Sequence, residues 1–202
     1  MRLVLASASP ARLATLRAAG VEPEVVVSGV DEEKIMAASP AELAAALAGL
    51  KAEAVAQRLG ADRLHVGAEL VLGCDSVFEM DGTGYGKPAD AGEAVARWRR
   101  MRGRTGTLHT GHHLVDLGSD RSVQAVGAAE VTFAQVNDAE IEAYVATGEP
   151  LNVAGAFTID GLGGPFVERV EGDPHTVVGL SLPLLRRMLA DLDVAWPSLW
   201  RA

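Results

Sequence analysis

The chain has 202 residues, of which 49% are hydrophobic and 22% charged, and its formal net charge is −9. This size and composition predict a single globular domain over residues 1–202, which could be divided into two lobes around a cleft. The acidic balance argues against a surface that coats nucleic acid or anionic lipid, but it leaves room for a local cationic site.

No apolar run approaches the roughly 18 residues of a membrane span. The stretch after Arg2 is also shorter than the roughly 7–15 apolar residues of a signal peptide, because Pro10 and Arg12 follow at once. Cys74 is the single cysteine, so an internal disulfide is excluded and a reducing compartment is indicated. We therefore expect a soluble, cytoplasmic protein with no membrane or nucleic-acid partner.

Cap residues predict several helices along the chain. Ser9 and Pro10 suit the start of the first helix, and Gly20 suits its end. Ser39 and Glu42 form a capping box before the second. Helices are expected at about residues 10–19, 40–59, 91–102, 138–146 and 182–192.

Strand candidates lie between these helices, and an Asp81–Gly82 turn predicts a hairpin. The candidates are residues 3–6, 23–28, 65–74, 76–80, 107–117, 123–136 and 165–170. Because strands alternate with helices while hairpins add antiparallel pairs, we expect an α/β fold with a mixed sheet. Trp196 and Trp200 indicate a C-terminal tail docked on the core, with a subunit contact as the alternative.

Arg12 lies in the first turn of the first predicted helix, where the helix dipole disfavours a cation. The hydroxyls of Ser7 and Ser9, the free N–H groups of the helix and the guanidinium would together form an anion site. A phosphate bound there would offset the unfavourable charge. The alternative is an arginine that faces solvent.

Asp75 interrupts the apolar run "ELVLGCDSVF", which predicts a buried strand. A carboxylate there is costly unless it is paired, bound to a metal or functional. Function is favoured because α/β sheets commonly place their sites at strand ends, and a structural hydrogen-bonding role is the alternative. Cys74 points to the opposite face of the strand and is expected in the core.

Four further charged side chains are weaker candidates. Lys51 projects from a half-apolar face of its helix, and Lys87 follows a glycine-rich turn. Each lysine taken alone is more simply a solvated side chain. Asp31 and Glu32 follow a predicted strand, a position that suits metal-facing carboxylates or a plain polar loop.

Several stretches resemble familiar motifs but lack residues or spacings that those motifs require. The stretch "DGTGYGKP" lacks the first glycine and the final Ser or Thr of a P-loop, and the glycine-rich "AGAFTIDGLGGPF" lacks a G-x-G-x-x-G before a helix. His109, His112 and His113 do not suit one metal ion, because His112 faces away and the other two would be roughly 13 Å apart on a strand. The arginines within residues 97–104 lie at a helix C-terminus, where cations are favoured, and a nucleic-acid patch is the minor alternative.

Seven segments, in order, make the chain similar to the Maf family of nucleoside triphosphate pyrophosphatases. They span residues 3–189 and read "LASASPAR", "VSGVDE", "LKAEAVA", "LGCDSV", "GKPADAGEA", "GEPLNVAGAFTIDGLGGPFV" and "VVGLSLPLL". The resemblance implies an elongated mixed β-sheet flanked by helices with a central cleft (Maf/ITPase-like), in a homodimer. It also implies cleavage of a nucleoside triphosphate to the monophosphate and pyrophosphate, assisted by a divalent cation such as Mg²⁺ or Mn²⁺.

Matched position by position, the resemblance assigns roles to individual residues. It implies that Asp75 is the proton acceptor and that Asp31 or Glu32 lies near the metal, with Asp75 itself as a further candidate ligand. The residues implied to bind the phosphates are Ser7, Arg12, Lys51 and Lys87.

Three positions depart from the family pattern and bear on the choice of base. Ala11 stands where many members have an arginine, and it also lacks the tryptophan of members that act on 7-methylguanosine triphosphate. Ser76 and Asp160 replace a threonine and a glutamine at positions tied to thymidine and uridine triphosphates. An ionised Asp160 only accepts hydrogen bonds, so it favours a base edge with donors, as in guanine, cytosine or a modified purine.

The association of the family with septation suggests a second hypothesis. The chain would then be a nucleotide-binding regulator of cell division or septum formation that does not turn its ligand over. Asp75 separates the two hypotheses, because a pure binding module has no use for an unpaired buried carboxylate beside a triphosphate.

Overall fold

The computed structural model of the protein describes residues 1–32, 35–61 and 69–200. In this part of the chain, seven strands form one sheet in the order β2-β1-β3-β5-β6-β7, with β4 paired to β3. The strands are β1 (Arg2–Leu5), β2 (Glu24–Val25), β3 (Glu69–Met80), β4 (Thr83–Tyr85), β5 (Thr105–Asp116), β6 (Arg121–Phe133) and β7 (Val167–Gly172). β1 runs parallel to β2 and β3, whereas the other pairs are antiparallel. The mixed sheet confirms the predicted fold class.

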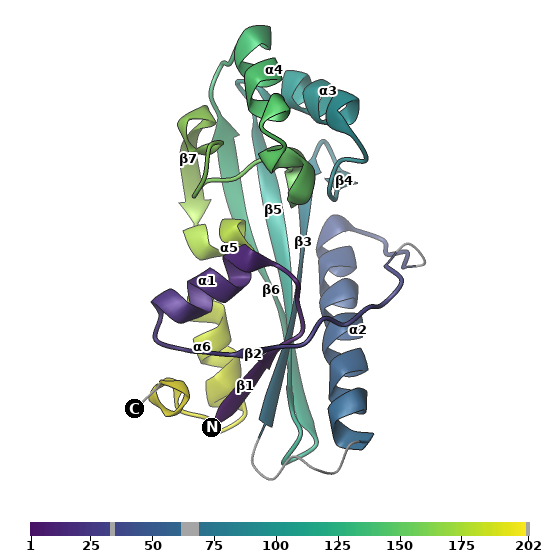
Figure 1. The fold of residues 1–202 in the computed structure, drawn as a ribbon, viewed down its shortest axis with the longest axis vertical. Helices are drawn as coiled ribbons and strands as arrows, with labels where there is room; N and C mark the ends of the chain where they lie inside the picture. Colours follow the sequence, from purple (N-terminus) through teal and green to yellow (C-terminus); the bar gives the residue numbers. More distant parts are fainter. Residues whose placement is uncertain (33–34, 62–68, 201–202) are drawn as a thin grey trace.

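Helices cover both faces of this sheet in an elongated molecule. The α-helices are α1 (Pro10–Ala18), α2 (Pro40–Ala61), α3 (Ala91–Met101), α4 (Asp138–Ala146), α5 (Pro174–Val178) and α6 (Leu182–Asp191). The short 3₁₀ helices are η1 (Glu149–Asn152), η2 (Ala154–Ala156), η3 (Gly164–Phe166) and η4 (Trp196–Leu199). Figure 1 shows α2 along one side of the lower half of the sheet, α1 and α6 along the other, and α3 and α4 at the upper end.

Strand alternation divides the core between the two faces of the sheet. On β3, Leu72 belongs to a buried cluster with Leu16 of α1, whereas Val71 belongs to a cluster with Val55 of α2. A third cluster at the upper end gathers aromatic rings around Trp98 of α3. The segment of β3 beyond Leu72 therefore lies between helices on both faces.

The predicted helices are confirmed, and their caps explain why. The side chains of Ser9, Asp90 and Ser181 each accept a backbone N–H from three residues later, as good N-caps do. α4 covers the predicted residues 138–146. α2 is longer than predicted and passes through Gly60 to Ala61, because one glycine costs a helix only about 1 kcal/mol.

β3 is the main departure from the expected strands. The candidates at residues 65–74 and 76–80 belong to one continuous strand, apart from residues 65–68, which lie outside the described chain. Asp75 therefore lies inside a strand and not at its end. The strand continues through Asp75 because the ladder with β5 uses backbone groups over residues 70–79, whatever the side chain. The candidate at residues 23–28 shortens to Glu24–Val25.

The hairpin turn and the docked tail are confirmed. Asp81 (φ 54°) and Gly82 (φ 73°) both have left-handed backbones, as a type I′ turn requires. At the C-terminus, Trp200 forms a β-bridge with Val21, and its ring lies against Gly20. Within the described residues, none of the helices combines the length and the apolar character needed to cross a bilayer.

Candidate active site

β1 and β4 pair with the same edge of β3 and leave a gap between them. β5 occupies the other edge over residues 70–79. β1 pairs with residues 69–72 and β4 with residues 78–80. Among the described strands, residues 73–77 consequently have no partner on this edge. We call this stretch the β3 gap, and it contains Asp75.

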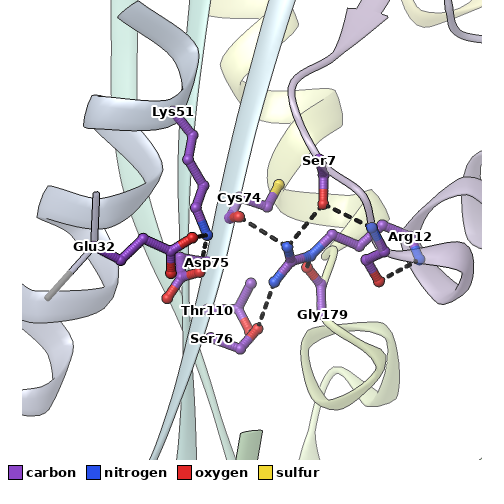
Figure 2. A network of polar contacts seen from close by, with 10 residues as sticks. Ser7, Arg12, Glu32, Lys51, Cys74, Asp75, Ser76, Thr110 and Gly179 are labelled. Atoms are coloured by element: carbon purple, nitrogen blue, oxygen red, sulfur yellow. Dashed lines mark hydrogen bonds and ion pairs between the residues drawn. The ribbon is translucent and has the colours of Figure 1, made fainter. Parts of the chain in front are cut away.

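On one side of the β3 gap, Lys51 of α2 reaches Asp75. The Nζ atom of Lys51 lies 2.5 Å from Oδ1 of Asp75 and 3.0 Å from Oε1 of Glu32, as Figure 2 shows. The side chains of Lys51 and Asp75 are 11% and 13% exposed, whereas that of Glu32 is 49% exposed. One ammonium group is thus shared by two carboxylates, and the partly buried Asp75 is compensated by a charged partner.

Two glycines on the sheet allow this contact. A Cβ atom on Gly73 would lie 2.3 Å from the carbonyl oxygen of Ala48, and one on Gly111 would lie 2.1 Å from that of Ala44. The backbone of α2 therefore rests directly on β3 and β5. Gly111 is the residue opposite Asp75 across the ladder, so this close approach brings α2 to the level of the carboxylate.

Arg12 lies on the other face of β3, where its guanidinium is bound by protein acceptors (Figure 2). Nε donates to the carbonyl of Gly179 at 2.7 Å, and Nη2 donates to Oγ of Ser76 at 3.1 Å. Nη1 donates to Oγ of Ser7 at 3.1 Å and to the carbonyl of Cys74 at 2.9 Å. Arg12 therefore ties the loop after β1, the β3 gap and the turn before α6 to one another.

This tie contradicts the alternative in which Arg12 faces solvent, whereas the anion site at Arg12 stays a prediction. The residue is only 9% exposed, and four of its five N–H groups donate to protein oxygens. The second N–H of Nη2 has no acceptor among the described residues. Because its acceptors include Cys74 and Ser76, the guanidinium touches the residues on both sides of Asp75.

A chain of hydrogen bonds behind Arg12, through Ser76, Thr110 and Thr176, was not predicted from the sequence. Oγ of Ser76 lies 2.9 Å from Oγ1 of Thr110, which donates to the carbonyl of Thr176 at 2.8 Å. Thr110 is fully buried, so the hydroxyls satisfy one another. The alternation of side chains along β5 could have indicated Thr110, because it places this polar residue on the same apolar face as Leu114.

His112 is a structural residue of the same region. Its Nδ1 lies 3.0 Å from the carbonyl of Thr110, and its Nε2 accepts the N–H of Ser181 at 2.9 Å. Burial lowers the pKa of His112 to about 4, which fits the neutral ring that these contacts require. His109 and His113 each pair with a glutamate instead.

Lys87 and Asp31 both lie outside the helices and strands. Lys87 is exposed and follows β4, in which Tyr85 pairs with Phe78. Because β4 is antiparallel to β3, the chain after Tyr85 continues toward the level of the β3 gap. Asp31 is exposed and precedes Glu32.

Asp160 lines a surface pocket of about 330 Å³. One face of α1, including Ala11, forms part of the wall, and His175 and Leu182 complete it. The pocket brings together Ala11 and Asp160, two of the positions expected to bear on base choice. Asp75 does not line it, so a single cleft that joins the two sites stays a prediction.

Glu32 and Asp75 are the carboxylates suited to a divalent cation. Their oxygens converge on the same Nζ atom of Lys51, and Mg²⁺ is commonly held by one or two carboxylates together with substrate phosphates and water. The described residues contain no cluster of three or more His, Cys, Asp or Glu side chains that could hold a metal. The donor set fits an ion that shares its coordination with a phosphate ligand.

Comparison with known proteins places nearly the whole chain in one family. The model of the Maf-like protein family matches residues 2–192. A relative from Salinispora tropica named "Nucleoside triphosphate pyrophosphatase" is 62% identical, over 99% of this chain and 88% of its own length. A relative of the same name from Streptomyces coelicolor is 58% identical, over 98% of this chain and 94% of its own. The solved Staphylococcus aureus Ham1 protein aligns with 67% of this chain and 73% of its own at 16% identity, and its TM-score of 0.46 is too low to support a conclusion.

Proposed function

The chain belongs to the Maf-like protein family, and we propose the following mechanism by which it hydrolyses a nucleoside triphosphate to the monophosphate and pyrophosphate. Its curated relatives are named nucleoside triphosphate pyrophosphatase, and the chain is accordingly a hydrolase of acid anhydrides. The observation that carries the mechanism is the contact between the partly buried Asp75 and Lys51 at the β3 gap.

Asp75 is the proton acceptor in this proposal. Water attacks the α-phosphorus, and its proton passes to the carboxylate of Asp75. The bond from the α-phosphorus to its bridging oxygen breaks, and pyrophosphate leaves with the electron pair. Lys51 supports the step because its ion pair with Asp75 holds the carboxylate in place at the β3 gap.

Cations from separate elements hold the triphosphate. Lys51 and Lys87 supply ammonium groups, and Arg12 supplies its remaining N–H, so that positive charge is concentrated locally in an acidic protein. Oγ of Ser7 accepts the N–H of Ser9 and one from Arg12, which leaves its own hydroxyl proton free to donate to a phosphate oxygen.

A divalent cation, Mg²⁺ or Mn²⁺, is part of the proposed site. Glu32 and Asp75 would hold it, with Asp31 beside them. When bound, the ion neutralises phosphate charge and polarises the phosphoryl group.

The metal assignment is tested with Glu32→Gln, which removes one carboxylate at an exposed position. We expect the variant to need about tenfold more Mg²⁺ for half-maximal activity, as loss of one metal-site residue typically costs. Titration of pyrophosphate release with Mg²⁺ measures the shift, and Glu142→Gln, at a side chain that is 65% exposed, is the control. An unchanged titration would remove Glu32 from the metal site.

The pocket at Asp160 is proposed to select the base. The carboxylate of Asp160 accepts hydrogen bonds, so the preferred base presents N–H donors, as guanine, cytosine or a modified purine does. Support comes from the shared pocket, in which Ala11 leaves room beside Asp160 and His175. Ser76 contributes to base selection indirectly, because its hydroxyl accepts a hydrogen bond from Arg12, the residue that follows the pocket-wall residue Ala11.

The function is tested by pyrophosphate release from a panel of normal and modified nucleoside triphosphates, each with Mg²⁺, with Mn²⁺ and with a chelator. We expect metal-dependent release that is fastest for bases with N–H donors at their recognition edge. Binding by calorimetry without release from any member of the panel would contradict the enzyme and favour the nucleotide-binding regulator of septum formation.

We further propose that the enzyme acts in the cytoplasm as a homodimer. The resemblance supports the dimer, and the acidic charge of −9 suits a free nucleotide substrate more than a polymer or a membrane. Sedimentation of the purified protein at micromolar concentration distinguishes dimer from monomer.

A further inference from the structure

Arg97 of α3 is a buried cation that the proposed mechanism does not use. Its side chain is 6% exposed, and burying a guanidinium is costly unless its N–H groups are well paired. Nη1 donates to the carbonyl of Gly86 at 2.6 Å, and Nη2 donates to Oε1 of Glu93 at 2.5 Å. Both acceptors border the turn between β4 and α3, which carries Lys87.

The first end of this turn is fixed at Gly86. Its carbonyl accepts the N–H of Gly155 at 3.1 Å in addition to Arg97. The guanidinium carbon of Arg97 also lies 5.0 Å from the centre of the Tyr85 ring, within the range of a cation–π contact. β4, α3 and η2 are thus joined immediately before Lys87.

The second end of the turn is fixed at Ala89. Oε2 of Glu93 accepts the N–H of Ala89 at 2.7 Å, while Oε1 of the same carboxylate accepts from Arg97. The hydrogen bond from Ala89 and then that from Arg97 lower the pKa of Glu93, so the carboxylate stays ionised. Pro88, which is buried, restricts the backbone between the two fixed points.

We infer that Arg97, acting with Glu93, is a positioning residue that holds the backbone around Lys87 so that its ammonium is ready for the triphosphate. The inference rests on the proposed function, in which Lys87 binds phosphate. Lysine has a long flexible stem, and ordering its backbone before substrate arrives lowers the entropy lost on binding. Arg97 itself donates hydrogen bonds to Gly86 and Glu93, so it acts through Lys87.

The test is a double-mutant cycle between Arg97→Met and Lys87→Ala. Methionine keeps the apolar stem and the helix propensity of Arg97 but removes the guanidinium group, which donates to Gly86 and Glu93. We expect Arg97→Met to raise KM for the triphosphate about tenfold with little change in kcat, because it misplaces a binding group. In the Lys87→Ala background the same substitution should change KM by less than about twofold, since there is no ammonium left to place.

Matched variants separate positioning from fold and from charge. Arg99→Met, on the exposed side of the same helix, should leave KM unchanged. Arg97→Lys keeps the charge but loses the planar guanidinium that donates to two acceptors at once, so its KM should rise as in Arg97→Met. Recovery of the parental KM by Arg97→Lys would contradict the positioning role. If Arg97→Met does not fold, Glu93→Gln at the exposed end of the pair should raise KM in the same direction.

The outcomes for Lys87→Ala distinguish this inference from the function beneath it. An unchanged KM for Lys87→Ala would remove Lys87 from the phosphate site and would overturn both that assignment and the role of Arg97. The other informative outcome is a raised KM for Lys87→Ala combined with an Arg97→Met effect on KM that is equally large in the parental and the Lys87→Ala backgrounds. That outcome would overturn the positioning role alone.

Discussion

Arg12 illustrates how a charged side chain is fixed by backbone groups that are distant in the sequence. Its acceptors Cys74 and Gly179 lie 62 and 167 residues away. The unfavourable position in the first turn of α1 is therefore compensated by carbonyl oxygens of the protein. A phosphate is proposed to add to this compensation and is not required for it.

We expect Arg12→Ala to lower the free energy of unfolding by about 2–4 kcal/mol, because it leaves the buried carbonyls of Cys74 and Gly179 without their charged donor. Denaturation with urea measures the change. Arg17→Ala, on the exposed side of the same helix, is the control and should alter the midpoint little. Equal midpoints for the two variants would contradict the structural tie.

At the scale of elements, the site depends on how closely α2 approaches the sheet. Gly73 and Gly111 leave no side chain between the helix backbone and strands β3 and β5. A helix at the ordinary distance from a sheet would carry Lys51 away from Asp75. The two glycines are therefore as necessary to the ion pair as its charged groups.

Gly111→Ala tests this dependence. The new methyl group would overlap the carbonyl of Ala44, so α2 has to shift, and we expect a stability loss of about 1–3 kcal/mol. Pyrophosphate release should fall with it, because the distance from Lys51 to Asp75 increases. Gly60→Ala in the same helix, where an added Cβ meets nothing within 4 Å, should leave activity intact. A fully active, stable Gly111→Ala protein would show that the close approach is dispensable.

The helices could be predicted from the sequence because their signals are local. The cap at Asn137 and the glycine after Thr147 bound α4 without reference to the rest of the chain. β3 could not be predicted in one piece, because a carboxylate within an apolar run resembles a strand end. Only the ladder to β5, whose residues lie about thirty or more positions later, keeps Asp75 inside the strand.

The site was predictable in its residue types and less so in its geometry. Lys51, Glu32 and Asp75 were expected near one another from the resemblance, and the structure brings them into direct contact. The ties made by Arg12 and the hydroxyl of Thr110 have partners from remote segments, so no local pattern could indicate them.

For the molecule as a whole, buried His112 couples folding to pH. Its pKa is about 4 in the folded protein and 6.5 in its ordinary state, so the unfolded chain takes up the proton first as pH falls. The stability due to a neutral His112 is complete above about pH 6.5 and declines toward pH 4, by about 3 kcal/mol in total.

Urea denaturation between pH 7.5 and 4 measures this decline. We expect His112→Gln, which cannot take up a proton, to be less stable at pH 7.5 but to lose less stability on acidification than the parent. His109→Gln, at a partly exposed pair with Glu79, is the comparison. This variant should still lose most of the unfolding free energy that the parent loses on acidification. An acid slope in His112→Gln as steep as that of the parent would contradict the assignment.

Asp75→Asn removes the carboxylate that is proposed to accept the proton of the attacking water. The measurement is the kcat of pyrophosphate release at saturating triphosphate and Mg²⁺, on protein that retains a cooperative unfolding transition. We expect a loss of about 10²- to 10⁴-fold, because asparagine preserves the shape but cannot take the proton. Turnover at the parental rate by the folded variant would contradict it.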